Sequence, residues 1–147
     1  MNKITSKAFL RTLFVTQNRW HKHSVLGHVF KVIFYTLRYR PRLFLVALLH
    51  DIGKPFVAHK DSDDLQRDYE SWSFTNHEEL SYMIIKNWFI PERTKILIRY
   101  HYLIRGMQKA LIKDPPKFRR LRRIWEKLPE DIKDDLYTFK ALDDKGK

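Results

Sequence analysis

The 147 residues are enough for one domain with its own hydrophobic core, and a hydrophobic content of 44% excludes an intrinsically disordered chain. The absence of cysteine excludes disulfides and thiolate metal sites, and no apolar run reaches the ~20 residues of a membrane span. The net charge of +12 favours a phosphate-rich partner, although basic side chains also keep exposed helix faces in solvent.

Only four glycines and six prolines interrupt the chain, which predicts an all-α fold with short connections. The N-terminus lacks the apolar run of a signal peptide, so we expect a cytoplasmic protein without membrane contact. A first helix is predicted over residues 6–15. Ser24 can cap the second helix, whose apolar stripe includes His28.

A third helix and a long loop are predicted next. Pro41 suits the first position of this helix, which carries His50 on its apolar face and stops near Gly53. Residues 54–74 hold five acidic side chains and show little periodicity. We expect a loop here that could form the rim or lid of a site, although a solvated insertion has the same composition.

Two further helices are predicted in the middle of the chain. Residues 75–78 have the form of a capping box, which places His77 in the first turn of a helix that runs to about Phe89. The next helix is predicted over residues 91–106, with Pro at its start and His101 on its apolar side.

The C-terminal part is predicted to be helical as well. Two prolines precede a basic amphipathic stretch over residues 117–123, and a last helix is predicted over residues 130–144. Phe139 and Asp143 lie on one face of that helix, because they are four residues apart. The whole pattern predicts a single helical bundle of about six to eight helices.

The dipeptide His50-Asp51 points to a metal centre. An imidazole and a carboxylate at the end of an apolar helix are costly to bury, and a divalent cation can bind both. Further candidate ligands lie on other predicted helices or at their ends: His28, His77, His101 and Asp143. A lone histidine of this kind is more often a hydrogen-bonded core residue, but the set together favours metal. Mn, Fe, Co, Ni, Zn or Mg would suit these ligands.

This order of residues resembles the HD-domain metal-dependent phosphohydrolases. Residues 47–55 fit the H-D-x-G-K-P signature, and residues 17–28, 74–78 and 99–101 resemble in particular the HD domain of bacterial tRNA nucleotidyltransferases. Two positions depart from or complicate the pattern. Gly27 stands where that group usually has an acidic residue, and Asp144 could replace Asp143 as the final aspartate.

The resemblance implies one free-standing HD domain over residues 1–147 and a centre with two divalent ions. His28, His50, Asp51 and Asp143 would hold one ion, and His77 and His101 would hold the other with Asp51 as the bridge. Ions about 3.5–4 Å apart would activate a shared water and clamp the phosphoryl oxygens. Asp51 and Lys54 would be catalytic, and Lys54 and His23 would face the substrate. Lys54 could instead be a helix C-terminal lysine stabilised by the macrodipole.

The function that the resemblance implies is hydrolysis of a phosphate on a nucleotide or an RNA end. The leading substrates are 2′,3′-cyclic nucleotides and 2′- or 3′-monophosphates. One alternative is a nucleotidase that uses a single metal, held by the first set of ligands alone. The other is a catalytically silent HD scaffold that binds nucleic acid or protein, for which the basic residues 117–123 could follow a phosphate backbone.

Overall fold

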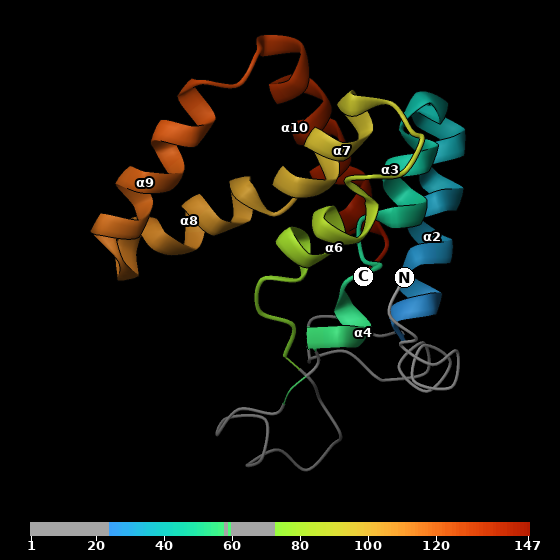
Figure 1. The fold of residues 1–147 in the computed structure, drawn as a ribbon, viewed down its shortest axis with the longest axis horizontal. Helices are drawn as coiled ribbons and strands as arrows, with labels where there is room; N and C mark the ends of the chain where they lie inside the picture. The colour runs from blue at the N-terminus through green and yellow to red at the C-terminus, as the bar shows by residue number, and fades with distance from the viewer. Residues whose placement is uncertain (1–23, 58, 60–72) are drawn as a thin grey trace.

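The computed structural model describes residues 24–57, 59 and 73–147. Within these residues it contains eight α-helices, one short 3₁₀-helix and no strand, apart from an isolated bridge between His59 and Ser73 (Figure 1). The prediction of an all-α bundle is therefore confirmed. The helix predicted over residues 6–15 and the position of His23 lie outside the described residues.

The N-terminal described helices follow their sequence signals closely. Helix α2, Val25–Tyr39, is capped by Ser24, whose Oγ accepts a hydrogen bond from the N–H of Gly27 at 3.2 Å. Pro41 opens the 3₁₀-helix η1, Pro41–Leu43, which leads directly into α3, Phe44–Leu49. The loop predicted over residues 54–74 begins later than expected, because residues 54–57 form the short helix α4, Lys54–Val57.

His77 lies in the first turn of α6, His77–Ile85, as predicted, but the cap and the end of this helix differ from the prediction. Its N-cap is Asn76, which has a φ of 61° and makes no capping hydrogen bond, so the predicted capping box is wrong. Asparagine tolerates this left-handed conformation, and the turn it makes leaves Thr75 one residue outside the helix. The helix ends at Ile85 instead of Phe89, because the N–H of Trp88 bonds back to Ile85 in a turn.

The single helix predicted over residues 91–106 is in fact two helices. Helix α7, Glu92–Tyr100, ends at a turn formed by His101 and Tyr102, and α8, Leu103–Lys113, follows. Gly106 does not stop α8 but lies inside it. A Cβ at Gly106 would lie 3.2 Å from the end of the Leu121 side chain, so α9 packs on α8 at this position.

The last helix begins at the predicted residue, whereas the helix of the basic stretch begins two residues before residue 117 and includes both prolines. Helix α9, Pro115–Glu126, is capped by the carboxylate of Asp114, and α10, Glu130–Lys145, follows Pro129. Helices α8 and α9 form an antiparallel hairpin that extends away from the other helices (Figure 1). No residue of α9 is fully buried, so this hairpin lies beside the core rather than inside it.

The core lies among α2, α3, α7 and α10 and surrounds the predicted ligands. It consists of Val32, Leu43, Val46, Ala47, Leu49, Ile85, Leu97, Ile98, Ile104, Ile132, Leu136 and Phe139. Phe139 is 1% exposed, and its ring makes T-shaped contacts with those of His50 and His101 at centroid distances of 5.2 and 6.4 Å. The core therefore fixes two candidate ligands directly. None of the described helices combines the length and the apolar character needed to cross a membrane.

Candidate metal centre

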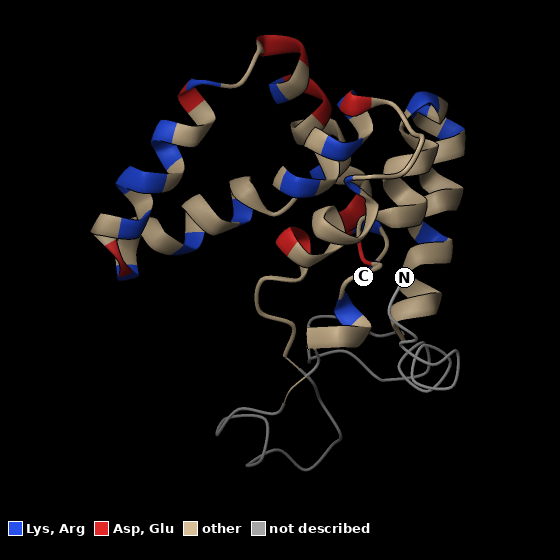
Figure 2. Cartoon of the chain, viewed as in Figure 1, with Lys and Arg blue, Asp and Glu red and all other residues tan. Residues whose placement is uncertain are grey.

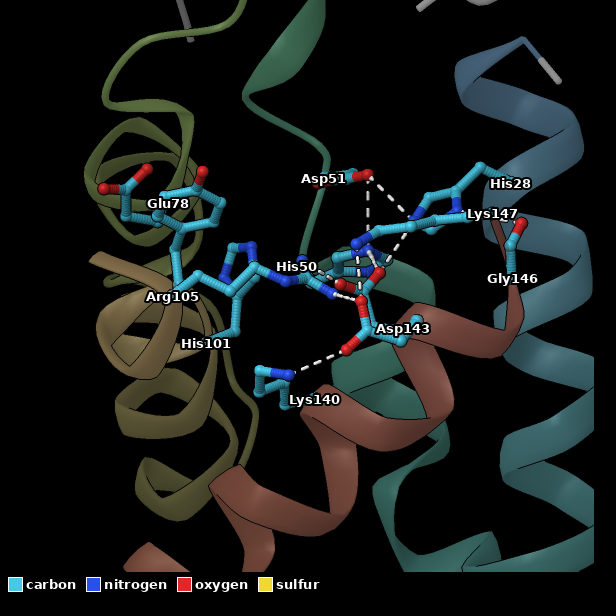
Figure 3. A network of polar contacts seen from close by, with 12 residues as sticks. His28, His50, Asp51, Glu78, His101, Arg105, Lys140, Asp143, Gly146 and Lys147 are labelled. Carbon is cyan, nitrogen blue, oxygen red and sulfur yellow. Dashed lines mark hydrogen bonds and ion pairs between the residues drawn. The ribbon is translucent and has the colours of Figure 1, made fainter. Parts of the chain in front are cut away.

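Five helix ends or faces converge on one buried cluster (Figure 3). The cluster consists of His28 from α2, His50 and Asp51 after α3, His77 at the start of α6, His101 after α7, and Asp143 from α10. All six side chains are buried. The structure therefore brings together all six residues that the sequence proposed as ligands. The first and the last of them, His28 and Asp143, are 115 positions apart in the chain.

Asp51 lies at the middle of the cluster. Its Oδ2 is 3.3 Å from Nε2 of His50 and 3.7 Å from Nε2 of His28, whereas its Oδ1 is 3.4 Å from Nε2 of His77. Nζ of Lys54 is 2.7 Å from Oδ2. The two oxygens of one carboxylate thus face two different sets of imidazoles, which is the placement that a bridging ligand requires.

Asp143 and Asp144 have different surroundings. The sequence leaves open which of the two is the final candidate ligand. Oδ1 of Asp143 is 2.8 Å from Nε2 of His28 and 3.5 Å from Nε2 of His50, and its Oδ2 pairs with Arg105 at 2.5 Å. Asp144 is half-buried and pairs with Arg105, Lys140 and Lys147. Asp143 is therefore the aspartate that belongs to the cluster.

The four histidines share one tautomer. In each ring Nδ1 lies beside a backbone carbonyl oxygen, and because a carbonyl can only accept, Nδ1 must carry the proton. The four partners are Gly146 for His28 at 3.2 Å, Ala47 for His50 at 2.9 Å, Phe74 for His77 at 2.9 Å, and Ile98 for His101 at 2.6 Å. This arrangement leaves Nε2 of every ring directed at the cluster, as in histidines that bind metal.

His77 and His101 fit a cation between them. Their Nε2 atoms are 3.2 Å apart, and burial lowers the pKa of His77 to about 4 and that of His101 to about 3. Both rings are therefore neutral at pH 7, with the proton on Nδ1. Two lone pairs that face each other at this distance repel unless a positive charge lies between them.

The other half of the cluster also has unsatisfied ligand atoms. Among the described residues, Nε2 of His50 and Oδ2 of Asp51 are buried and have no hydrogen bond of acceptable geometry, although Oδ2 forms an ion pair with Lys54. Ligand atoms within 4.8 Å of one another form two sets, His28–His50–Asp51 and Asp51–His77–His101, which share Asp51. These residues fit two divalent cations, because imidazole nitrogen and carboxylate oxygen are their usual ligands.

Both carboxylates are ionised at neutral pH, as metal ligands must be. Burial alone would raise the pKa of Asp51, but the charges of His50 and Lys54 lower it well below its usual value. Burial acts on Asp143 in the same way, but its close contacts with His28 and His50 and the charge of Arg105 lower its pKa well below the usual value.

His50 makes metal binding dependent on pH. Burial lowers its pKa, but the carboxylates of Asp51 and Asp143 raise it, to about 9 in the metal-free protein. The ring therefore carries an extra proton at pH 7, which must leave when a cation binds. We expect the metal affinity to rise with pH, by up to about tenfold per unit below the pKa of His50.

Titration calorimetry in buffers of different ionisation enthalpy measures this proton, with about one released per chain expected at pH 7. The stability of the metal-free protein has the opposite dependence. The contribution of His50 is complete below pH 6.5 and is lost as the pH rises towards 9. A metal affinity that does not change between pH 6.5 and pH 9 would contradict the assignment of His50 as a ligand.

Ser81 is a positioning residue that the sequence analysis missed. Its Oγ donates a hydrogen bond to the carbonyl oxygen of His50 at 2.8 Å and accepts one from the N–H of Gly53 at 2.9 Å. Ser81 is fully buried in α6, so it links that helix to the turn that carries Asp51. A single serine within a helix gives no sequence signal for such a contact.

We expect Ser81→Ala to lower the free energy of unfolding by about 1–3 kcal/mol, because two buried backbone groups lose their partner. Metal affinity should fall as well, since the turn after His50 is no longer held. Urea denaturation and metal titration measure the two effects. An unchanged denaturation midpoint would mean that the Ser81 contacts do not hold the turn.

The two predicted substrate-facing residues have different outcomes. His23 lies outside the described residues. Lys54 is buried, is the first residue of α4 and not its last, and lies beside Asp51. Its charge therefore lies against a buried carboxylate and not at an exposed helix end. Its ammonium also lies 5.5 Å from the centre of the Phe74 ring.

A cleft of about 900 Å³ opens onto the cluster. Asp51, His77, His101 and Asp143 line its inner end together with Lys54. The aromatic side chains of Phe74, Tyr100 and Tyr102 line it next to the histidines, and α8 and α9 form its outer wall. The candidate metal centre is therefore accessible to a ligand of nucleotide size.

Comparison with known protein families gives one match. The model of the HD domain matches residues 25–141, which includes every member of the cluster except Asp143. A comparison with curated proteins finds no match.

Proposed function

The chain belongs to the HD-domain family, and we propose that it acts as a divalent-metal-dependent phosphohydrolase on a nucleotide or an RNA end. One observation carries the proposal. Two buried sets of histidine and aspartate share Asp51 and face a cleft of about 900 Å³. Buried polar atoms normally have hydrogen-bond partners, so several Nε2 atoms directed at one accessible point indicate a ligand such as a cation.

Each residue of the cluster has a role in this proposal. His28, His50, Asp51 and Asp143 would hold one cation, and His77, His101 and Asp51 would hold a second. Bound divalent cations would supply a water nucleophile at neutral pH and neutralise charge on the phosphoryl group.

Residues around the cluster position the ligands. Arg105 binds Oδ2 of Asp143, which turns Oδ1 towards His28 and His50. The ring of Phe139 packs against the rings of His50 and His101 in T-shaped contacts and so holds them in place. Lys54, at the inner end of the cleft, is placed to neutralise a phosphate oxygen of the substrate.

The finer substrate assignment rests on the sequence resemblance to the HD domain of bacterial tRNA nucleotidyltransferases. It favours 2′,3′-cyclic nucleotides and 2′- or 3′-monophosphates. Phe74 and Tyr102 support a nucleotide, because their rings line the cleft beside the histidines, where a base could stack. The extent of the domain over residues 1–147 and the cytoplasmic location stay predictions.

Incubation of the chelator-treated protein with 2′,3′-cyclic AMP tests the proposal. We expect ring opening only after addition of Mn²⁺ or Ni²⁺, with slower or absent hydrolysis of a 5′-monophosphate. No turnover of cyclic nucleotides or monophosphates with any divalent metal would contradict the proposed function. In that case the alternative of a silent HD scaffold that binds nucleic acid or protein would be favoured.

A further inference from the structure

The hairpin of α8 and α9 carries a row of cations along the cleft. Lys109 and Lys113 follow Arg105 at intervals of four residues on α8, which places all three on one face of the helix. Lys117 and Arg120 of α9 line the same cleft. We call Lys109, Lys113, Lys117 and Arg120 the basic rail; Figure 2 shows basic residues along both helices of the hairpin.

The outer part of the rail makes no ion pair with a described acidic residue, although Glu78 lines the same cleft and feels the charge of Lys117. None of Lys113, Lys117 and Arg120 forms an ion pair with another described residue, although all three are exposed. Asp114 lies among them, but its carboxylate accepts a hydrogen bond from the N–H of Lys117 at the start of α9. The inner cations differ, since Arg99 pairs with Glu79 and Arg105 with Asp143.

Only part of the basic stretch identified in the sequence faces the cleft. Lys117 and Arg120 line it, whereas Arg119 and Arg123 are exposed on α9 and do not. The i, i+3 spacing of the first pair places them on one face of the helix. Two sets of basic residues on the same helix can therefore be compared directly.

An aromatic residue separates the rail from the candidate metal centre. The ring of Tyr102 lies 5.7 Å from that of His77 in a T-shaped contact, and Nζ of Lys109 lies 5.1 Å from its centre and bonds its hydroxyl. From the inside outwards, the cleft therefore presents ligands for metal, an aromatic ring and then a row of cations. The α8 part of this row, from Arg105 to Lys113, spans about 12 Å.

This order matches a strand end better than a mononucleotide. The charge of a mononucleotide lies on the phosphate at the candidate metal centre, so it would leave the outer cations without a partner. Further phosphates of a chain would lie along the row, and a base would stack on Tyr102. We propose that the cleft takes the end of a single-stranded oligoribonucleotide, with its preceding phosphates on the basic rail.

The assignment of the reacting end rests on the proposed function, but binding to the rail does not. Two double variants test it: Lys113→Glu with Lys117→Glu, and Arg119→Glu with Arg123→Glu. Both change the net charge equally and alter exposed residues of the same hairpin, but only the first pair lines the cleft. Circular dichroism verifies that each variant is folded.

Binding is measured by fluorescence anisotropy with a labelled oligouridylate of about ten nucleotides and no added metal, between about 50 and 200 mM salt. We expect the rail variant to bind about tenfold or more weakly than the Arg119/Arg123 variant. The slope of log affinity against log salt should also become shallower, by about 0.7 for each lost phosphate contact.

Turnover provides a second readout. The ratio of kcat/KM for an oligonucleotide with a 2′,3′-cyclic end to kcat/KM for 2′,3′-cyclic AMP should fall in the rail variant. In the Arg119/Arg123 variant the ratio should stay at the wild-type value. A rail that only stabilises the hairpin would change both substrates alike.

Several outcomes would overturn the inference. Equal loss of binding in the two double variants would show a general effect of charge. Equal competition by inorganic polyphosphate, or equal binding of a duplex, would overturn the assignment to a single strand. If binding depends on the rail but no metal supports turnover, the proposed function and the assignment of the reacting end fail while the strand-binding surface stands.

Discussion

Replacement of Asp51 by alanine is expected to abolish metal-dependent hydrolysis. Asp51 is the residue common to both sets of ligand atoms, and its two oxygens face different histidines. Its loss removes a ligand from each proposed ion, which we expect to lower kcat/KM for 2′,3′-cyclic AMP by about 10³-fold or more. Steady-state rates at saturating Mn²⁺, with metal analysis of the dialysed protein, measure both effects.

The control for this variant is Asp144→Ala. Asp144 lies close in sequence to a proposed ligand but is half-buried and pairs with basic side chains. Because ion pairs that are only partly buried contribute about 0–1 kcal/mol, the variant should stay folded and keep most of its activity. Removal of Asp51 also breaks a buried ion pair with Lys54, so Asp51→Asn serves as the variant of nearly equal shape. A wild-type rate in either Asp51 variant would place the reaction at another site.

Gly53→Ala is expected to disrupt the centre through its packing. A Cβ at Gly53 would lie 2.6 Å from the carbonyl oxygen of His77 and 2.7 Å from the backbone nitrogen of Ser81. These are backbone atoms of α6, which can move only with the whole helix. We expect a loss of about 1–3 kcal/mol in the free energy of unfolding, together with weaker metal binding as His77 moves away from Asp51.

Gly106→Ala is the matched control, because it makes the same change inside a helix. Its Cβ would approach only the end of the flexible Leu121 side chain, at 3.2 Å. Alanine is favoured over glycine in a helix by about 1 kcal/mol, so this variant should be as stable as the wild type or more stable. Urea denaturation compares the two. Equal midpoints for both variants would show that α6 does not pack tightly on Gly53.

The beginnings of helices were predictable because their signals are local. Ser24, Pro41 and the two prolines in the first turn of α9 act within one turn of the helix start, and the structure has a helix at each of them. The break at His101 was not predictable from such signals. It depends on the placement of the ring against the core, where His101 contacts Phe139, a residue of a distant helix.

The same distinction applies to the candidate site. Histidine and aspartate are few enough that their positions on predicted helices indicated which residues converge, and the structure brings them together. Ser81 acts on the backbone carbonyl of His50, 31 positions away, and Arg105 acts on the carboxylate of Asp143, 38 positions away. Serine and arginine are common in helices, so neither stands out before the fold is known.

The basic stretch shows a similar limit. Its composition indicated a phosphate partner, but not which side chains face the cleft. That property depends on how α9 packs on α8, and the close approach at Gly106 helps to fix it. The sequence could therefore indicate the chemistry of the ligand and not the path that the ligand takes.

The central claim is that Asp51 bridges two divalent cations. Anomalous scattering from a crystal equilibrated with Mn²⁺ tests it most directly. Two peaks are expected, one beside His28 and His50 and the other beside His77 and His101, with Asp51 between them. A single peak, or peaks away from Asp51, would contradict it.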